Sequence, residues 1–155
     1  MPSFVLTTIF CLGSLLLSQS AYATLGENSD SVSRVQKAFN ATKKPGTSSI
    51  NYTVEVLTSP GSVIKEYLSK DGTVFAVTWK GLSRPNLALL FGQYYQEFAQ
   101  ASELKQRTLS IRARRETIHG SSIQVFRSRH GHDNRGLAYV TSLLPAGVQP
   151  KELQP

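Results

Sequence analysis

The chain has 155 residues and a formal net charge of +7, from 17 Lys and Arg against 10 Asp and Glu. Apolar residues make up 40% and charged residues 17%, which is typical of a folded domain and argues against a disordered chain. This length fits one domain. Cys11 is the single cysteine, so a disulfide-rich scaffold is excluded.

The first 23 residues are expected to be a secretory signal peptide. Residues 4–17 are apolar-rich and uncharged, and as a helix they would span about 21 Å, less than the ~30 Å core of a bilayer. Ala21-Tyr22-Ala23 follows and has the small-x-small pattern of a cleavage site. The alternatives are a buried helix of the fold and an uncleaved anchor. Cleavage after Ala23 leaves a cysteine-free chain, exported to the periplasm or the medium, with no remaining membrane span.

Apolar spacing predicts a short helix over residues 31–41, capped by Asp30, Ser31 or Ser33. Lys43-Lys44-Pro45-Gly46 ends this helix, and residues 45–49 are expected to form a loop. Alternating or continuous apolar runs then predict three strands, at 50–57, 62–69 and 73–79.

The Asp71-Gly72 turn sets the pairing of the second and third of these strands. A two-residue turn places one set of side chains on a common face: Ile64, Leu68, Phe75, Val77 and Trp79. Glu66 lies in the middle of this apolar set. We expect Glu66 to be partly exposed and paired with a nearby Lys or Arg; the alternative is a carboxylate with a perturbed pKa at a functional site.

A long amphipathic helix is predicted over residues 84–104. Its apolar positions recur at helical spacing: Leu87, Leu90, Phe91, Tyr94, Tyr95, Phe98 and Ala101. We expect this stripe to pack on the sheet and to form one core with Phe75 and Trp79; a ligand-stacking surface is the alternative.

Three further strands are predicted at 109–118, 121–128 and 136–142, with connecting turns at His119-Gly120 and at residues 130–135. Residues 149–155 are expected to be a tail without regular structure, after a domain that covers residues 24–148. The predicted fold is therefore α+β: an antiparallel sheet of about six strands in two hairpins or meanders, one long helix packed on it, and a short N-terminal helix.

Catalytic motifs are absent: the sequence has no P-loop, no G-x-G-x-x-G, no H-E-x-x-H, no G-x-S-x-G and no C-x-x-C. One weak metal-site candidate consists of His130, His132 and Asp133, because two imidazoles and a carboxylate are metal ligands. His119 would add a third histidine only if both turns lie at the same end of the sheet. The alternative is a solvated polar turn.

Basic residues concentrate in the second half of the chain. Between Lys105 and Arg135 there are eight Lys or Arg residues and two acids, Glu116 and Asp133. The two-residue period of a strand predicts a shared solvent-exposed surface for four of them: Arg112, Arg114, Arg127 and Arg129. Guanidinium groups bind phosphate and carboxylate in bidentate fashion, so this surface is a candidate site for an anionic partner. The alternative is a solvated arginine face without a ligand.

Several segments together resemble a known family. They are residues 23–27 (ATLGE), 52–55 (YTVE), 59–67 (SPGSVIKEY), 71–81 (DGTVFAVTWKG), 85–87 (PNL), 89–95 (LLFGQYY) and 144–148 (LPAGV). This combination is similar to bacterial exported proteins of domain of unknown function 2844. The resemblance implies export and a bacterial origin, and it carries no activity and no catalytic residue.

These observations predict an exported, non-catalytic binding module without a cofactor. Its partner would be an acidic protein or an anionic envelope polymer rather than a specific nucleic acid. The alternative is a small metal-dependent enzyme that uses His130, His132 and Asp133.

Overall fold

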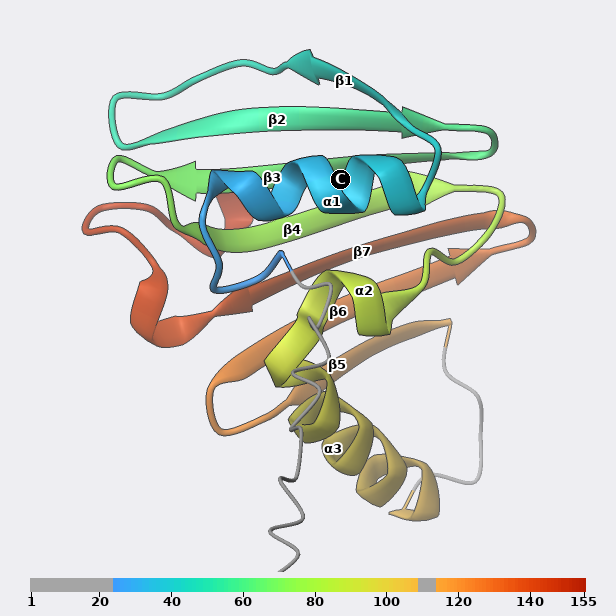
Figure 1. The fold of residues 1–155 in the computed structure, drawn as a ribbon. Coiled ribbons are helices and arrows are strands. Elements are labelled where there is room, and N and C mark those ends of the chain that lie inside the picture. Colours follow the sequence, from blue (N-terminus) through green and yellow to red (C-terminus); the bar gives the residue numbers. More distant parts are fainter. Residues whose placement is uncertain (1–23, 109–113) are drawn as a thin grey trace, which may run out of the picture.

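A computed structural model describes residues 24–108 and 114–155. Within these residues, seven strands form one antiparallel sheet in the order β1-β2-β3-β4-β7-β6-β5 (Figure 1). The strands are β1 (Thr42–Pro45), β2 (Tyr52–Ser59), β3 (Ser62–Ser69), β4 (Val74–Gly81), β5 (Arg115–His119), β6 (Ile123–His130) and β7 (Asp133–Val140). The predicted α+β class is confirmed, with one strand more than expected.

The extra strand is β1, which lies at the edge of the sheet beside β2, with Pro45 opposite Glu55. The sequence predicted only a helix stop and a loop here, because two lysines and a proline do not resemble a strand. At the edge of a sheet, one side of the strand has no neighbour. Proline is tolerated there, because its missing N–H can be on the unpaired side. The Lys43 ammonium forms an ion pair with the Glu55 carboxylate across the two strands.

The short helix α1 (Ser29–Ala38) lies over β3 and β4 on one face of the sheet and runs roughly along them (Figure 1). It buries Val32 and Val35. The residue that caps it is Asn28, whose side chain accepts a 3.2 Å hydrogen bond from the Asp30 N–H, and not one of the three expected residues. An Asn side chain at this position satisfies one of the free N–H groups of the first turn.

The long helix is present but interrupted. It consists of α2 (Leu87–Phe91), the 3-10 turn η1 (Gly92–Tyr94) and α3 (Tyr95–Thr108). The break is at Gly92, where φ is +49°, a region that glycine adopts without a side-chain clash. Leu90, Phe91 and Phe98 are buried as expected, whereas the Tyr95 side chain beyond the break is 38% exposed.

Phe75 lies on the opposite face of the sheet from Trp79, so the prediction that these two aromatic residues share a core is wrong. Ile64 pairs with Trp79 and Glu66 with Val77 as expected, but Leu68 pairs with Val74, because the register shifts between Tyr67 and Leu68. A β-bulge of this kind adds a residue to one strand and turns the side chains beyond it to the other face. Phe75 therefore packs with Tyr67 and Tyr52.

The C-terminal segment covers this second face and is not an unstructured tail as predicted. Residues Pro150–Glu152 form a 3-10 turn, and Leu153 is buried beside Tyr67 and Phe75. The Gln154 carbonyl accepts a 3.0 Å hydrogen bond from the Tyr67 hydroxyl. Apolar residues from this segment thus complete a second, smaller core.

The three last strands form a meander, as predicted, with bounds shifted by a few residues. The first half of the expected strand 109–118 lies outside the described residues, and so does the whole expected signal peptide. Among the described residues, no helix is both long and apolar enough to cross a membrane.

Candidate functional site

The β6–β7 connection is much tighter than the six-residue turn expected from the sequence. His130, the last residue of β6, pairs with Asp133, the first residue of β7, so only Gly131 and His132 form the turn. Gly131 has a φ of +59°, which suits glycine in a two-residue hairpin turn. This tight turn extends both strands and brings their polar ends beside the start of β5.

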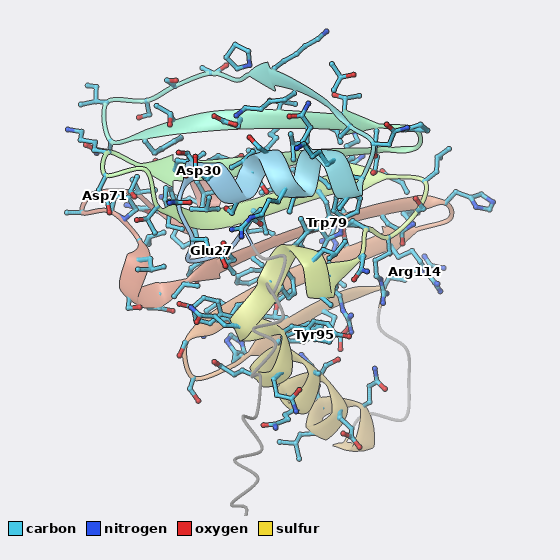
Figure 2. The ribbon with its side chains drawn as sticks, in the orientation of Figure 1. Glu27, Asp30, Asp71, Trp79, Tyr95 and Arg114 are labelled. Carbon is cyan, nitrogen blue, oxygen red and sulfur yellow. The ribbon has the colours of Figure 1, made fainter. Side chains whose placement is uncertain are left out.

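A pocket of about 460 Å³ lies at this end of the sheet. Figure 2 shows Arg114 at this end and Asp71 at the opposite end. The lining residues are predominantly basic: Arg114, Arg115, Ser128, Arg129, His130, Asp133 and Arg135. Asp133 is the one acid among them, and the Arg135 guanidinium binds it at 2.6 Å. The hydrogen bond from Arg135 lowers the pKa of Asp133, so the carboxylate is ionised and engaged. We call this cavity the basic pocket.

Strand pairing explains why distant arginines meet at the basic pocket. Arg115 pairs with Ser128, and Ser128 pairs with Arg135 on its other side. Arg135 in turn pairs with Lys80 on β4, so three exposed cations lie in one row across four neighbouring strands. Because adjacent strands are about 4.8 Å apart, the row spans roughly 14 Å. Among residues 24–108 and 114–155, Arg114, Arg115 and Arg129 form no ion pair.

Arg127 does not line the basic pocket, and the expectation that it is solvent-exposed is wrong. Its side chain is 14% exposed and lies on the helix-covered face, where it forms a 2.6 Å ion pair with Glu116. The guanidinium carbon lies 5.5 Å from the ring centre of Phe98, and an N–H donates to the Ser102 hydroxyl at 3.3 Å. The acid on β5 and the helix together cover this guanidinium, and strand alternation alone does not reveal either neighbour.

The four predicted arginines are therefore divided. Arg114 and Arg129 line the basic pocket, Arg127 is held beneath α3, and Arg112 lies outside the described residues. Two residues that the prediction omitted, Arg115 and Arg135, complete the pocket. The clue in the sequence was the Arg114-Arg115 pair: neighbouring strand residues point to opposite faces, so Arg115 lies on the other face from Arg114, and the basic pocket takes side chains from both faces at this end of the sheet.

A further arginine, Arg84, lies near Arg127 and Arg129 and adds positive charge at this end of the sheet. Burial lowers its pKa, and the neighbouring guanidinium groups of Arg127 and Arg129 lower it further, whereas Glu116 acts in the opposite direction. Like charges accumulate here from segments more than forty residues apart in sequence. An anion near this end of the sheet would relieve their repulsion.

The histidines are not gathered into one cluster. His119 ends β5, beside the β5–β6 turn, whereas His130 ends β6, beside the β6–β7 turn. Consecutive turns of a meander lie at opposite ends of the sheet, and an eight-residue strand is roughly 24 Å long, so His119 and His130 are far apart. In the described part of the chain, no three His, Cys, Asp or Glu side chains lie close enough to hold a metal ion.

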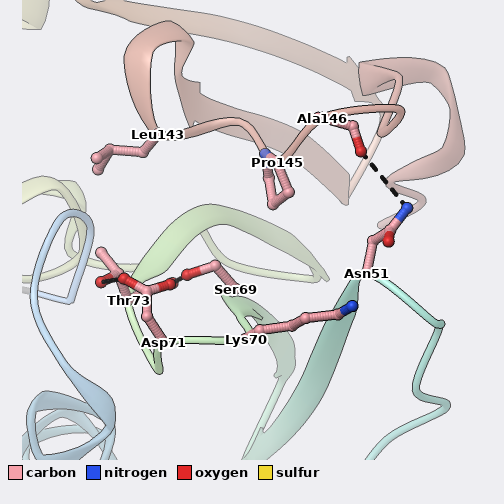
Figure 3. Close-up of a pocket in the computed structure, with 8 residues that line it drawn as sticks. All are labelled: Asn51, Ser69, Lys70, Asp71, Thr73, Leu143, Pro145 and Ala146. Carbon is pink, nitrogen blue, oxygen red and sulfur yellow. Dashed lines mark hydrogen bonds between the residues drawn. The ribbon is translucent and has the colours of Figure 1, made fainter.

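A second cavity, of about 370 Å³, lies at the other end of the sheet, between the β3–β4 turn and residues 143–146, which follow β7 (Figure 3). Its polar groups bind one another: the Thr73 hydroxyl donates to the Asp71 carboxylate at 2.8 Å, and the Ser69 hydroxyl donates to the Thr73 carbonyl at 2.9 Å. Hydrogen bonds from Ser69 and Thr73 lower the pKa of Asp71. These polar groups already satisfy one another's hydrogen bonds. The second cavity has one basic lining residue, Lys70, whereas the basic pocket has four arginines.

Glu66 is fully buried, which contradicts the expectation of a partly exposed, paired side chain. Among the described residues, neither of its carboxylate oxygens has a hydrogen-bond partner. Burial raises its pKa from 4.5 to about 8; the Thr24 hydroxyl lowers it, the Glu55 carboxylate raises it, and Lys43 lowers it. The perturbed carboxylate that the sequence left as an alternative is therefore present, in the core rather than at a pocket.

The chain belongs to the family described as "protein of unknown function (DUF2844)", whose model matches residues 21–153. This match confirms the resemblance inferred from the sequence. No curated protein and no solved structure matches the chain.

Proposed function

We propose that the protein is exported with cleavage after Ala23, and that it is a non-catalytic module whose basic pocket binds an anionic envelope polymer. The observation that carries the proposal is the pocket lining, in which four arginines and one histidine face a single acid. Arginine binds carboxylate, sulfate and phosphate through paired N–H groups. Arg114, Arg115 and Arg129, which form no ion pair with any described residue, are available for such contacts.

An aromatic pair, of which Phe126 is exposed and Tyr139 half-buried, favours a polymer built from sugar rings over an acidic protein. Phe126 precedes Ser128 by two residues on β6, so it lies on the same face as the row of cations. Its ring is 37% exposed and stacks on Tyr139, with ring centres 6.3 Å apart and planes 14° from parallel. A flat aromatic surface beside guanidinium groups suits a ligand that alternates apolar ring faces with acidic substituents.

Replacing four pocket arginines by glutamine should weaken binding to anionic polymers. The variant carries Arg114→Gln, Arg115→Gln, Arg129→Gln and Arg135→Gln. We expect it to elute from heparin and phosphocellulose at a markedly lower salt concentration than the unmodified protein. Salt itself should weaken the interaction steeply, because the screening length falls from about 10 Å at 0.1 M to about 3 Å at 1 M.

The matched control replaces four exposed lysines outside the basic pocket by glutamine, which removes the same net charge. They are Lys37, Lys44, Lys70 and Lys151. Equal loss of retention in both variants would show that net charge alone causes binding, and would contradict the pocket. Immobilised poly-glutamate provides a third matrix. If the pocket arginines matter more for poly-glutamate than for the two sugar polymers, the partner is an acidic protein.

Export has its own test, the intact mass of the protein recovered from the periplasm or the medium. We expect a chain that begins at Thr24, because the Ala21-Tyr22-Ala23 pattern directs cleavage to this bond. Retention in the cytoplasm, or a different first residue, would contradict this part of the proposal.

A further inference from the structure

The segment that follows the expected cleavage site is built into the core. Thr24 and Leu25 are fully buried. The Leu25 N–H donates to the Leu90 carbonyl at 3.1 Å, and the Gly26 N–H donates to the Val74 carbonyl at 2.7 Å. These bonds fix the start of the described chain between α2 and the first residue of β4.

Thr24 lies beside the Glu66 carboxyl group. Its hydroxyl is close enough to lower the pKa of Glu66, although it donates its own hydrogen bond to the Leu90 carbonyl at 3.1 Å. The backbone nitrogen of a threonine is only roughly 3 Å from its hydroxyl oxygen. A charge on this nitrogen would therefore lie close to the Glu66 carboxyl group, in the range over which a neighbouring cation shifts a carboxyl pKa.

The other charged groups near Glu66 do not neutralise it. Glu55, opposite on β2, has the same sign, and Lys43 on β1 is bound to Glu55. On the same face, α1 contributes Val32 and Val35 to the core, and α2 contributes Leu90 and Phe91. A buried carboxylate without a partner cation is strongly disfavoured.

We propose that removal of the leader creates the missing cation: the α-ammonium group of Thr24 forms a buried ion pair with Glu66 and stabilises the mature fold. This inference rests on the proposed export and cleavage. Hydrolysis of the Ala23–Thr24 peptide bond by the export peptidase consumes one water, leaves a carboxylate on Ala23, and leaves an amine on Thr24 that takes up a proton.

The pair changes the protonation of Glu66. A cation within about 4–6 Å lowers a carboxyl pKa by about 1–3, enough to ionise Glu66 near neutral pH. Without the amine, Glu66 is protonated in the folded state at neutral pH. Stability is then greatest below the unfolded pKa of 4.5 and is lost as the pH rises through about 8. Cleavage thus converts a group that weakens the fold at neutral pH into one that stabilises it.

The test compares Glu66→Gln in two exported chains at pH 7. One has the natural sequence, and the other has a glycine inserted between Ala23 and Thr24, which displaces the amine by one residue. In the natural chain, Glu66→Gln breaks the pair and should lower Tm by about 5 °C or more. In the chain with the inserted glycine, the same substitution removes an unpaired acid and should raise Tm, with the gain vanishing at pH 4.

The sign of the change in Tm caused by Glu66→Gln shows whether the ion pair forms. If Glu66→Gln raises Tm in both chains, or lowers it in both, the pair does not form. Intact masses separate the two proposals: a recovered chain that begins at Thr24 but gives the same sign overturns only the ion pair, whereas any other first residue overturns the cleavage and the pair together.

A second measurement needs no substitution at Glu66. The Thr24 amine of the natural exported protein should react with an acylating reagent at least about tenfold more slowly in the folded state than in the unfolded state. Mass analysis of the N-terminal peptide measures this. An amine that reacts equally fast in both states would overturn the proposal.

Discussion

Replacing Phe91 by alanine should lower the free energy of unfolding by about 3–5 kcal/mol. The side chain is fully buried at the centre of the helix-covered core. Its ring centre lies 6.0 Å from that of Trp79 and 5.1 Å from that of Phe98 in an edge-to-face contact. Alanine would leave a cavity and remove both ring contacts, because the surrounding sheet and helix cannot close completely around the gap. Urea unfolding measures the loss.

Leu82→Ala is the matched control, since the Leu82 side chain is 71% exposed. This truncation should change stability by less than about 0.5 kcal/mol. If Phe91→Ala leaves the unfolding midpoint as unchanged as Leu82→Ala does, α2 does not pack on β4 as described.

Gly136→Ala should destabilise the protein by about 1–3 kcal/mol. Gly136 on β7 lies directly opposite Trp79 on β4, and the added Cβ would overlap the indole ring of Trp79. The ring is rigid and buried, so it moves only by disturbing Phe91 behind it. Thermal unfolding measures the effect.

A double substitution tests the cause. Gly136→Ala combined with Trp79→Leu should cost less than the sum of the two single substitutions, because the smaller side chain relieves the overlap. Ser128→Ala on the neighbouring strand serves as control and should have little effect. Strictly additive costs would show that the indole does not lie against Gly136.

Local signals were enough to predict most of the elements. Residues 62–69 were predicted with the bounds of β3, and the Asp71-Gly72 turn identified the β3–β4 hairpin. The helical stripe predicted the burial of Leu90, Phe91 and Phe98. Such features depend on the period of two or 3.6 residues within one segment, so they can be read without knowledge of any partner.

The site was only half predictable. Arg114 and Arg129 were singled out, but the sequence missed Arg115 and Arg135 and misplaced Arg127. Which face of a strand is covered depends on where the helix packs, and this depends on contacts across the whole sheet. Alternation tells which residues share a face, not which face is exposed.

By itself, the sequence determined the α+β class, the family and most of the elements, because each has a local or compositional signature. Only the tertiary structure decided the bulge that turns Phe75 to the second face, the cover that the C-terminal segment provides there, and the meeting of β5, β6 and β7 at the basic pocket. It also placed Thr24 beside Glu66, more than forty residues away in the chain. The physical reason is the same in each case: burial and charge are set by neighbours that are remote in sequence, and one residue of register shift moves a side chain from one face to the other.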